Sequence, residues 1–184
     1  MLNLVKPRIG ILALMQGLYD ESQPEIPANQ IRFVEDVIEQ LKDTAEFVFP
    51  GLSKEREHTE RIVKGFNDQE LDGIMIINTL YSPGLRIVQA FKKNNLPVML
   101  ANIQPLPNVT DDWNWSYLTT NQGIHGIQDT SNMLMRLGYQ PAIITEDWKS
   151  DKFKEFVKNW AMAAGTANAL RRCRLALMQK MQNM

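Results

Sequence analysis

Short, wholly apolar runs alternate with segments of helical periodicity along the chain, and this alternation constrains the fold more than any single motif. The first run, "RIGILALM" (Arg8–Met15), is typical of a strand buried on both faces. Further apolar runs predict strands within residues 45–52, 72–80, 96–104 and 140–147, and a helical segment follows each of them. In the first helical segment one core-facing stripe is predicted, made of Ile31, Val34, Val37, Ile38 and Leu41.

Strands that are apolar on both faces and alternate with helices predict a parallel sheet covered by helices on two sides. Right-handed crossovers then indicate an α/β, three-layer, flavodoxin-like or Rossmann-like domain with a parallel sheet of five or six strands. We expect residues 1–184 to form this single domain, with "CRLALM" (173–178) as the start of a sixth strand. The polar ending "QKMQNM" continues no apolar pattern, so the chain looks truncated before a further part of the protein.

The charge balance and the single cysteine exclude several classes of protein. Twenty basic and 21 acidic residues give a formal net charge of −1, which argues against a nucleic-acid or membrane-surface partner. Cys173 has no second cysteine with which to form an intrachain disulfide, and it fits a reducing cytoplasm. The N-terminal apolar run is too short to span a bilayer. We therefore expect a cytoplasmic protein.

Ligands of an open parallel sheet bind at the carboxyl ends of the strands, which selects the loops at 15–20, 50–53, 79–83, 102–118 and 146–149. None of these loops carries a dinucleotide glycine pattern, a Walker sequence or a flavodoxin phosphate loop. His58 lies in a charged helical segment and is expected to be solvated, as are the adjacent carboxylates Glu146 and Asp147. We expect neither a nucleotide cofactor nor a metal to be bound by this chain.

The same loops gather neutral hydrogen-bonding groups, which suit sugar hydroxyls because these donate and accept together. The candidates are Gln16, Tyr19, Asn102, Gln104, Asn121, Gln122 and His125. Gln16 and Asn102 could equally serve turns or caps, and Thr119 or Thr120 is expected to cap the helix that begins in "LTTNQGIHGIQDTSNML". His125 near the first turns of that helix is either a buried neutral imidazole that donates to a ligand or a structural histidine.

Three tryptophans could supply apolar platforms for sugar rings, namely Trp113, Trp115 and Trp148. Each could instead pack under the long loop or in a subunit interface. Because the loop with Trp113 and Trp115 exposes apolar area, we also expect self-association.

Four ordered segments resemble a known family over essentially the whole chain. They are "MQGLYD", "NIQPL", "LTTNQGIHGIQDTSNMLMRLG" and "PAIITEDWKSDK", and their order is that of the N-terminal domain of the bacterial L-arabinose isomerase and L-fucose isomerase family. The most specific element is the group Asn121, Gln122, His125 and Gly126.

The resemblance implies an intramolecular oxidoreductase that interconverts an aldose and a ketose with a divalent metal, usually Mn²⁺. It implies that two glutamates and two histidines of later domains hold the metal, so this chain alone would be inactive and would bind no cofactor. It also implies a homo-oligomer in which the N-terminal domain reaches a neighbouring active site. By that analogy the residues that contact or shape the sugar pocket are Gln16, Leu18, Tyr19, Gln122 and His125.

One departure leaves the sugar open: where family members often carry "TGHW", this chain has "TEDW" (Thr145–Trp148). A second hypothesis is a free-standing, non-catalytic sugar-binding or oligomerisation module, and a third is a flavodoxin-like electron carrier.

Overall fold

A parallel sheet forms the centre of the protein. The computed structural model describes residues 6–174. The strands are β1 (Arg8–Leu14), β2 (Glu46–Val48), β3 (Leu52–Ser53), β4 (Gly73–Asn78), β5 (Val98–Asn102) and β6 (Ala142–Thr145). Their order in the sheet is β2-β1-β4-β5-β6, with β3 also paired to β1, and each pair is parallel. The predicted fold class is confirmed.

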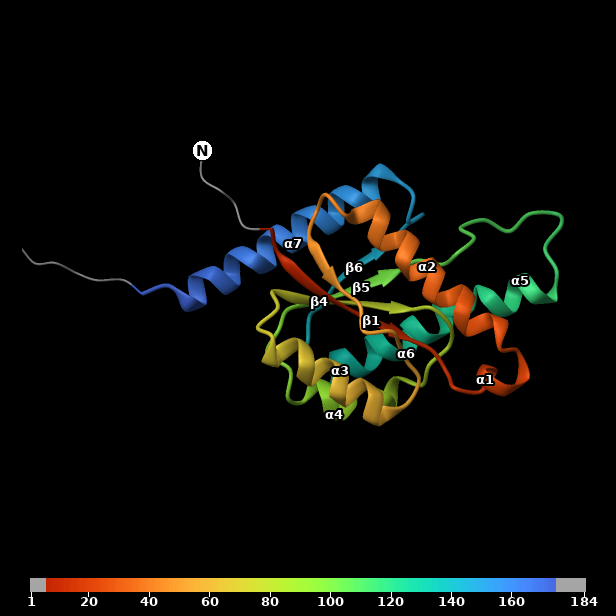
Figure 1. Ribbon diagram of the computed structural model, residues 1–184, viewed down its shortest axis with the longest axis horizontal. Helices are drawn as coiled ribbons and strands as arrows, with labels where there is room; N and C mark the ends of the chain where they lie inside the picture. Colours follow the sequence, from red (N-terminus) through yellow and green to blue (C-terminus); the bar gives the residue numbers. More distant parts are fainter. Residues whose placement is uncertain (1–5, 175–184) are drawn as a thin grey trace, which may run out of the picture.

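Helices cover both faces of this sheet (Figure 1). On one face lie α2 (Glu25–Leu41) and α7 (Asp151–Arg172), and on the other lie α3 (Arg56–Asp68), α4 (Val88–Phe91) and α6 (Gly123–Arg136). Shorter helices occupy the connections: α1 (Tyr19–Ser22), the 3₁₀ turn η1 (Gly84–Arg86) and α5 (Trp115–Thr120). In the part of the chain from residue 6 to residue 174, no helix is both long and apolar enough to cross a membrane.

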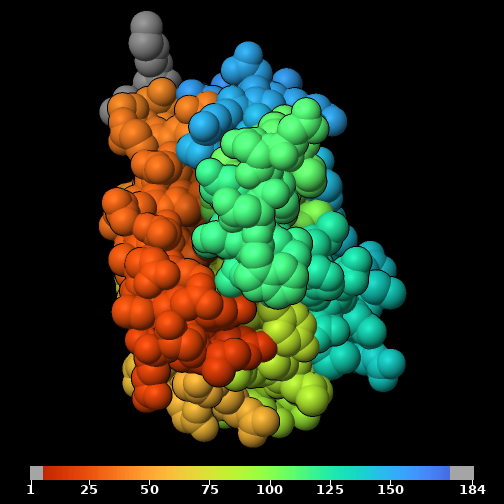
Figure 2. Space-filling model, turned by 90° about the vertical axis from the view of Figure 1, so that its right-hand side faces the viewer, coloured from red at the N-terminus to blue at the C-terminus, as the bar shows by residue number. Residues whose placement is uncertain are grey.

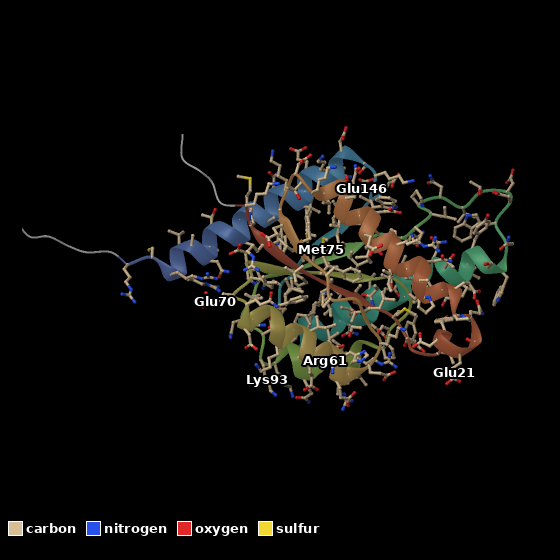
Figure 3. The ribbon with its side chains drawn as sticks, in the orientation of Figure 1. Glu21, Arg61, Glu70, Met75, Lys93 and Glu146 are labelled. Carbon is tan, nitrogen blue, oxygen red and sulfur yellow. The ribbon has the colours of Figure 1, made fainter. Side chains whose placement is uncertain are left out.

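The strands are apolar throughout because each face of the sheet has its own core. Ile9 and Ile11 of β1 belong to the cluster with α2 and α7, whereas Leu12 and Leu14 belong to the cluster with α3, α4 and α6. Met75 lies in the middle of the sheet in Figure 3, and it is fully buried. This two-sided burial is the physical reason for runs that do not alternate with polar residues.

The strand order places a topological switch between β1 and β4. From β1 the chain moves to β2 on one side, and from β4 it continues to β5 on the other. In such sheets the loops diverge at the switch point and leave a crevice outside the carboxyl ends of the two strands. The carboxyl edge of β1 and β4 is therefore where a ligand is expected.

Two predicted elements differ from the structure. Residues 45–52 do not form one strand, because Gly51 takes a φ of 104° and the chain turns between β2 and β3. Residues after Ser82 form η1 and then α4 instead of a single helix, and Pro83 precedes the turn. The sixth strand predicted at 173–178 falls largely outside the described residues; Cys173 and Arg174 have no regular structure.

Candidate functional site

The segments that follow β1 and β4 are tied together at the carboxyl edge of the sheet. The carbonyl oxygen of Leu14 accepts hydrogen bonds from the backbone N–H and the hydroxyl of Thr79, at 3.0 and 3.1 Å. The N–H of Met15 donates to the carbonyl oxygen of Ser53 at 3.1 Å, so the end of β3 joins them. Residues on the loop after β1 are thereby held beside residues on the loop after β4.

The start of α6 lies directly on the end of β4. A Cβ atom on Gly123 would overlap the backbone carbonyl oxygen of Asn78, and one on Gly126 would lie 2.5 Å from the Asn78 amide nitrogen and 3.0 Å from the carbonyl oxygen of Leu80. Glycine is required at both positions because a side chain would separate helix and strand. This close approach brings the α6 N-terminus to the same edge.

The loop after β1 carries the first group of predicted site residues. Tyr19 packs against the small buried cluster of Met15, Ile26 and Leu80, and Leu80 is also the residue that Gly126 approaches. Gln16 is half-buried, and the Leu18 side chain is 68% exposed. Figure 2 shows this red-orange segment beside the green segment that carries α5, on one face of the molecule.

The second group lies at the start of α6, and here one expectation is wrong. His125 is exposed, not buried, because it lies on the outer side of the first helical turn while Gly123, Gly126 and Ile127 face inward. Gln122 occupies the N-cap position with a half-buried side chain that makes no capping hydrogen bond. Both side chains can therefore reach a ligand outside the fold.

The threonines do not cap α6, contrary to the prediction. Leu118–Thr120 belong to the end of α5, which Asn114 caps by accepting hydrogen bonds from the N–H groups of Ser116 and Tyr117 at 2.9 and 3.2 Å. The hydroxyls of Thr119 and Thr120 donate back to carbonyl oxygens of α5 itself. The chain then breaks at Asn121 before α6 begins.

Three of the candidate amides have structural partners. Asn121 is buried, accepts from the N–H of Leu106 at 2.8 Å and donates to the carbonyl oxygen of Tyr117 at 2.8 Å. Asn102 donates to the Thr145 hydroxyl at 3.0 Å, and Gln104 donates to the Leu106 carbonyl oxygen at 3.0 Å. Asn121 thereby fastens the long loop to the end of α5, whereas Asn102 joins β5 to β6 and Gln104 bonds within the loop.

The tryptophans divide into packing and exposed residues. Trp148 is 9% exposed and meets Phe33 edge to face, with ring centroids 5.8 Å apart. Trp113 donates its indole N–H to the carbonyl oxygen of Asn108 at 3.1 Å. Trp115 is 79% exposed. Trp148 is thus a core residue, and Trp115 is the tryptophan with the most surface to offer a partner.

Sequence reasoning missed a polar group beside the site. The Tyr81 hydroxyl donates to the Asp129 carboxylate at 3.2 Å, and burial together with this hydrogen bond raises the pKa of Tyr81. Arg86 donates to the carbonyl oxygens of Lys54 at 2.5 Å and Met15 at 3.4 Å. Tyr81 could have been identified from the sequence, since it lies in the loop that follows the third predicted strand.

The carboxylates after β6 are engaged locally. Glu146 forms an ion pair with Lys152 at 2.6 Å, and the side-chain hydrogen bond with Lys152 lowers the pKa of Glu146. Asp147 accepts from the N–H of Lys149 at 2.9 Å. Within residues 6–174 no group of three or more His, Cys, Asp or Glu side chains is placed to hold a metal ion. The described residues do not fit a metal centre.

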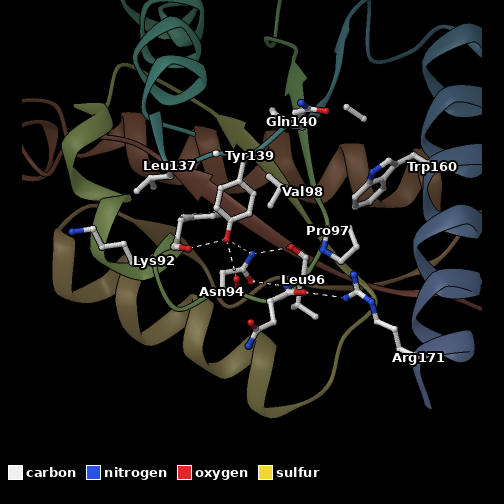
Figure 4. Close-up of a pocket in the computed structure, with 15 residues that line it drawn as sticks. Lys92, Asn94, Leu96, Pro97, Val98, Leu137, Tyr139, Gln140, Trp160 and Arg171 are labelled. Atoms are coloured by element: carbon white, nitrogen blue, oxygen red, sulfur yellow. Dashed lines mark hydrogen bonds between the residues drawn. The ribbon is translucent and has the colours of Figure 1, made fainter. Parts of the chain in front are cut away.

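A hollow of about 750 Å³ lies at the opposite, amino edge of the sheet (Figure 4). Its polar groups bond to one another: the Tyr139 hydroxyl lies 2.7 Å from the carbonyl oxygen of Phe91, and Asn94 donates to the carbonyl oxygen of Leu96 at 2.8 Å. Arg171 donates to the carbonyl oxygen of Asn95 at 3.4 Å. None of the predicted sugar-site residues lines this hollow.

The fold is a three-layer α/β domain, and neutral polar side chains lie at its switch point together with the charged Arg86 and Asp129. The chain belongs to the L-arabinose isomerase N-terminal domain family, whose model matches residues 6–172. The family resemblance noted in the sequence is thereby confirmed.

Other comparisons are weaker. No curated protein matches the chain. A lac repressor dimer bound to operator and the anti-inducer ONPF is similar at 14% identity and a TM-score of 0.37, over 88% of this chain and 53% of the repressor chain. The psychrotrophic esterase EstA from Pseudoalteromonas sp. is similar at 9% identity and a TM-score of 0.37, over 90% of this chain and 99% of the esterase. This chain thus spans about half the length of the repressor chain.

Proposed function

We propose that this chain is the N-terminal part of a metal-dependent aldose–ketose isomerase of the L-arabinose or L-fucose type, and that its carboxyl edge completes the sugar pocket of a neighbouring subunit. The observation that carries the proposal is the shared edge. Gln16, Leu18 and Tyr19 after β1 lie at the same end of the sheet as Gln122 and His125 on α6. The single cysteine supports a cytoplasmic location.

The chemistry of this edge suits a polyol. The amides of Gln16 and Gln122 each donate and accept hydrogen bonds, and the imidazole of His125 can do either. The exposed Leu18 side chain offers apolar surface to the C–H face of a sugar. None of these side chains carries a fixed charge. A fixed charge would be unfavourable here, because a neutral sugar could not balance it.

The exposure of the edge supports a pocket shared with a second subunit. Leu18 is 68% exposed and His125 is also on the surface, so this edge encloses no ligand by itself. A sugar bound here would be buried when another protein surface closes over it.

The manganese that such a reaction uses would be held elsewhere, because the described residues offer no metal centre. When bound, the metal polarises the sugar carbonyl and stabilises the charge that develops on its oxygen. The residues of this chain then have a binding role: they hold the sugar hydroxyls and orient the substrate.

The test compares two substitutions in the full-length protein that contains this chain. His125→Ala should raise KM for the sugar about fivefold, because loss of one hydrogen bond costs about 1 kcal/mol and a tenfold change corresponds to about 1.4 kcal/mol. Its manganese content should not change. Gln140→Ala, an exposed residue at the amino edge of the sheet, is the control and should leave KM as it was. An unaltered KM in His125→Ala would remove the sugar-binding role.

A further inference from the structure

Three buried side chains along the contact between β4 and α6 have polar atoms without a hydrogen-bond partner in the described structure. They are Asn78, whose oxygen and nitrogen are both unpaired, Ser82 and Thr130. Their exposures are 2%, 1% and 0%. Buried polar groups in folded proteins are bonded to protein or to ordered water, so this concentration at one contact requires an explanation.

Thr130 differs from other helical threonines of the chain. Thr119, Thr120 and Thr166 each donate their hydroxyl to the carbonyl oxygen four residues earlier in the helix. Thr130 faces the sheet from α6 and makes no such bond. A hydroxyl that leaves its own helix backbone normally has another acceptor or donor nearby.

The three side chains lie along one seam. Asn78 approaches Gly126, which is one helical turn before Thr130 on the inner face of α6. Gly84, two residues after Ser82, is so close to α6 that a Cβ atom there would lie 2.5 Å from the carbonyl oxygen of Asp129, the neighbour of Thr130. The glycines thus bring the backbones of β4, η1 and α6 together, and the three buried polar residues belong to these same segments or adjoin them.

The seam has the donors and acceptors that water needs. An asparagine amide offers two N–H donors and an acceptor, and each hydroxyl can donate and accept. A buried water typically makes about three hydrogen bonds to groups of this kind. A ligand larger than water is excluded at this seam, because protein atoms fully cover the polar atoms.

We propose that the seam between β4, η1 and α6 is a buried hydration site, in which water bound by Asn78, Ser82 and Thr130 completes the hydrogen bonding and fixes the height of α6 above the sheet. If the proposed function holds, this site positions Gln122, which immediately precedes Gly123, and His125, which immediately precedes Gly126. Asn78, Ser82 and Thr130 are then positioning residues.

Thr130→Val, measured in the 184-residue chain, tests the site without any sugar. The substitution keeps the volume and removes the hydroxyl. If the hydroxyl binds water, Tm should fall by about 2–4 °C, the shift that about 1 kcal/mol gives in a chain of this size. If the hydroxyl has no partner, Tm should rise, because a buried unsatisfied group has been removed. A rise would overturn the proposal.

The control is Thr44→Val, a buried threonine whose hydroxyl donates directly to the carbonyl oxygen of Leu41 at 2.7 Å. It should lower Tm by a similar amount. The backbone amide resonances of residues 122–126 should shift in Thr130→Val and stay in place in Thr44→Val; unshifted resonances in both would overturn the positioning role.

A second measurement covers the case in which a variant fails to fold. Water-to-protein cross-relaxation peaks to the Thr130 methyl group and the Asn78 side-chain amide should be present in the unmodified chain. Their absence would overturn the hydration site. Neither measurement involves sugar, so a failed sugar assay bears on the proposed function alone.

Discussion

A Cβ atom on Gly123 would lie only 2.2 Å from the backbone carbonyl oxygen of Asn78. Asn78 ends β4, the strand beside β1 at the switch point, and Gly123 begins α6. This contact sets where the helix with Gln122 and His125 starts relative to the sheet. The contribution of this contact to stability can be measured, because any side chain at position 123 would push α6 and β4 apart.

Gly123→Ala should therefore destabilise the fold by about 1–3 kcal/mol, the usual cost of overpacking. Chemical denaturation measures this loss. Gly65→Ala is the matched control within α3, where the nearest heavy atom to a new Cβ would be a flexible glutamine end at 4.0 Å. The control should instead gain about 0.5–1 kcal/mol, because alanine is the better helix former. Equal effects of the two substitutions would contradict the close contact.

Asn121→Ala should loosen the long loop after β5. The substitution leaves the N–H of Leu106 and the carbonyl oxygen of Tyr117 without their partner, at a cost of about 1–3 kcal/mol. Hydrogen exchange of the amides in residues 105–120 should accelerate. Asn132→Ala, an exposed asparagine on α6, should change stability by no more than about 0.5 kcal/mol and leave that exchange unaltered.

The fold could be predicted from the sequence because a strand that is buried on both faces has an unbroken run of apolar residues. β1 and β4 appear as runs of apolar residues, and the helical stripe of α2 is seen in its buried residues Val34, Val37 and Leu41. The apolar pattern did not indicate the break between β2 and β3 or the separate helix α5. Each depends on local bonds, such as the Asn114 cap, that several sequences of similar polarity could make.

The candidate site was harder to predict, because amides serve both structure and ligands. Asn121 and Gln122 are neighbours in sequence, yet Asn121 is bonded to the loop and Gln122 makes no capping bond. The same ambiguity applied to His125, whose exposure depends on which turn of α6 faces the sheet. Periodicity placed it on a helix but did not show that the glycines at 123 and 126 occupy the inner face.

Tyr81 should ionise above the ordinary tyrosine pKa. Burial and the hydrogen bond to Asp129 both disfavour the phenolate, so the pKa is raised in the folded state. The unfolded chain then loses its proton at a lower pH than the folded chain. This group's contribution to stability is complete below the ordinary pKa of about 10 and disappears as pH rises through the folded pKa.

Ultraviolet titration measures this ionisation, and Tyr81→Phe should remove a component of the absorbance change that develops above the ordinary tyrosine pKa. A titration curve that keeps that component in Tyr81→Phe would contradict the assignment.

Self-association is expected through the surface formed by α5 and the loop before it. Val109, Trp115, Tyr117 and Leu118 are exposed there, Trp115 at 79%, and they adjoin the edge that carries the proposed sugar-binding residues. Trp115→Ser should shift the chain toward the monomer at a given concentration, because tryptophans are frequent anchors of interfaces. Sedimentation velocity measures the change in mass. Leu170→Ser on α7 removes an exposed apolar side chain elsewhere and should leave the association unaltered. A chain that is monomeric before any substitution would show that this surface does not join copies of the domain.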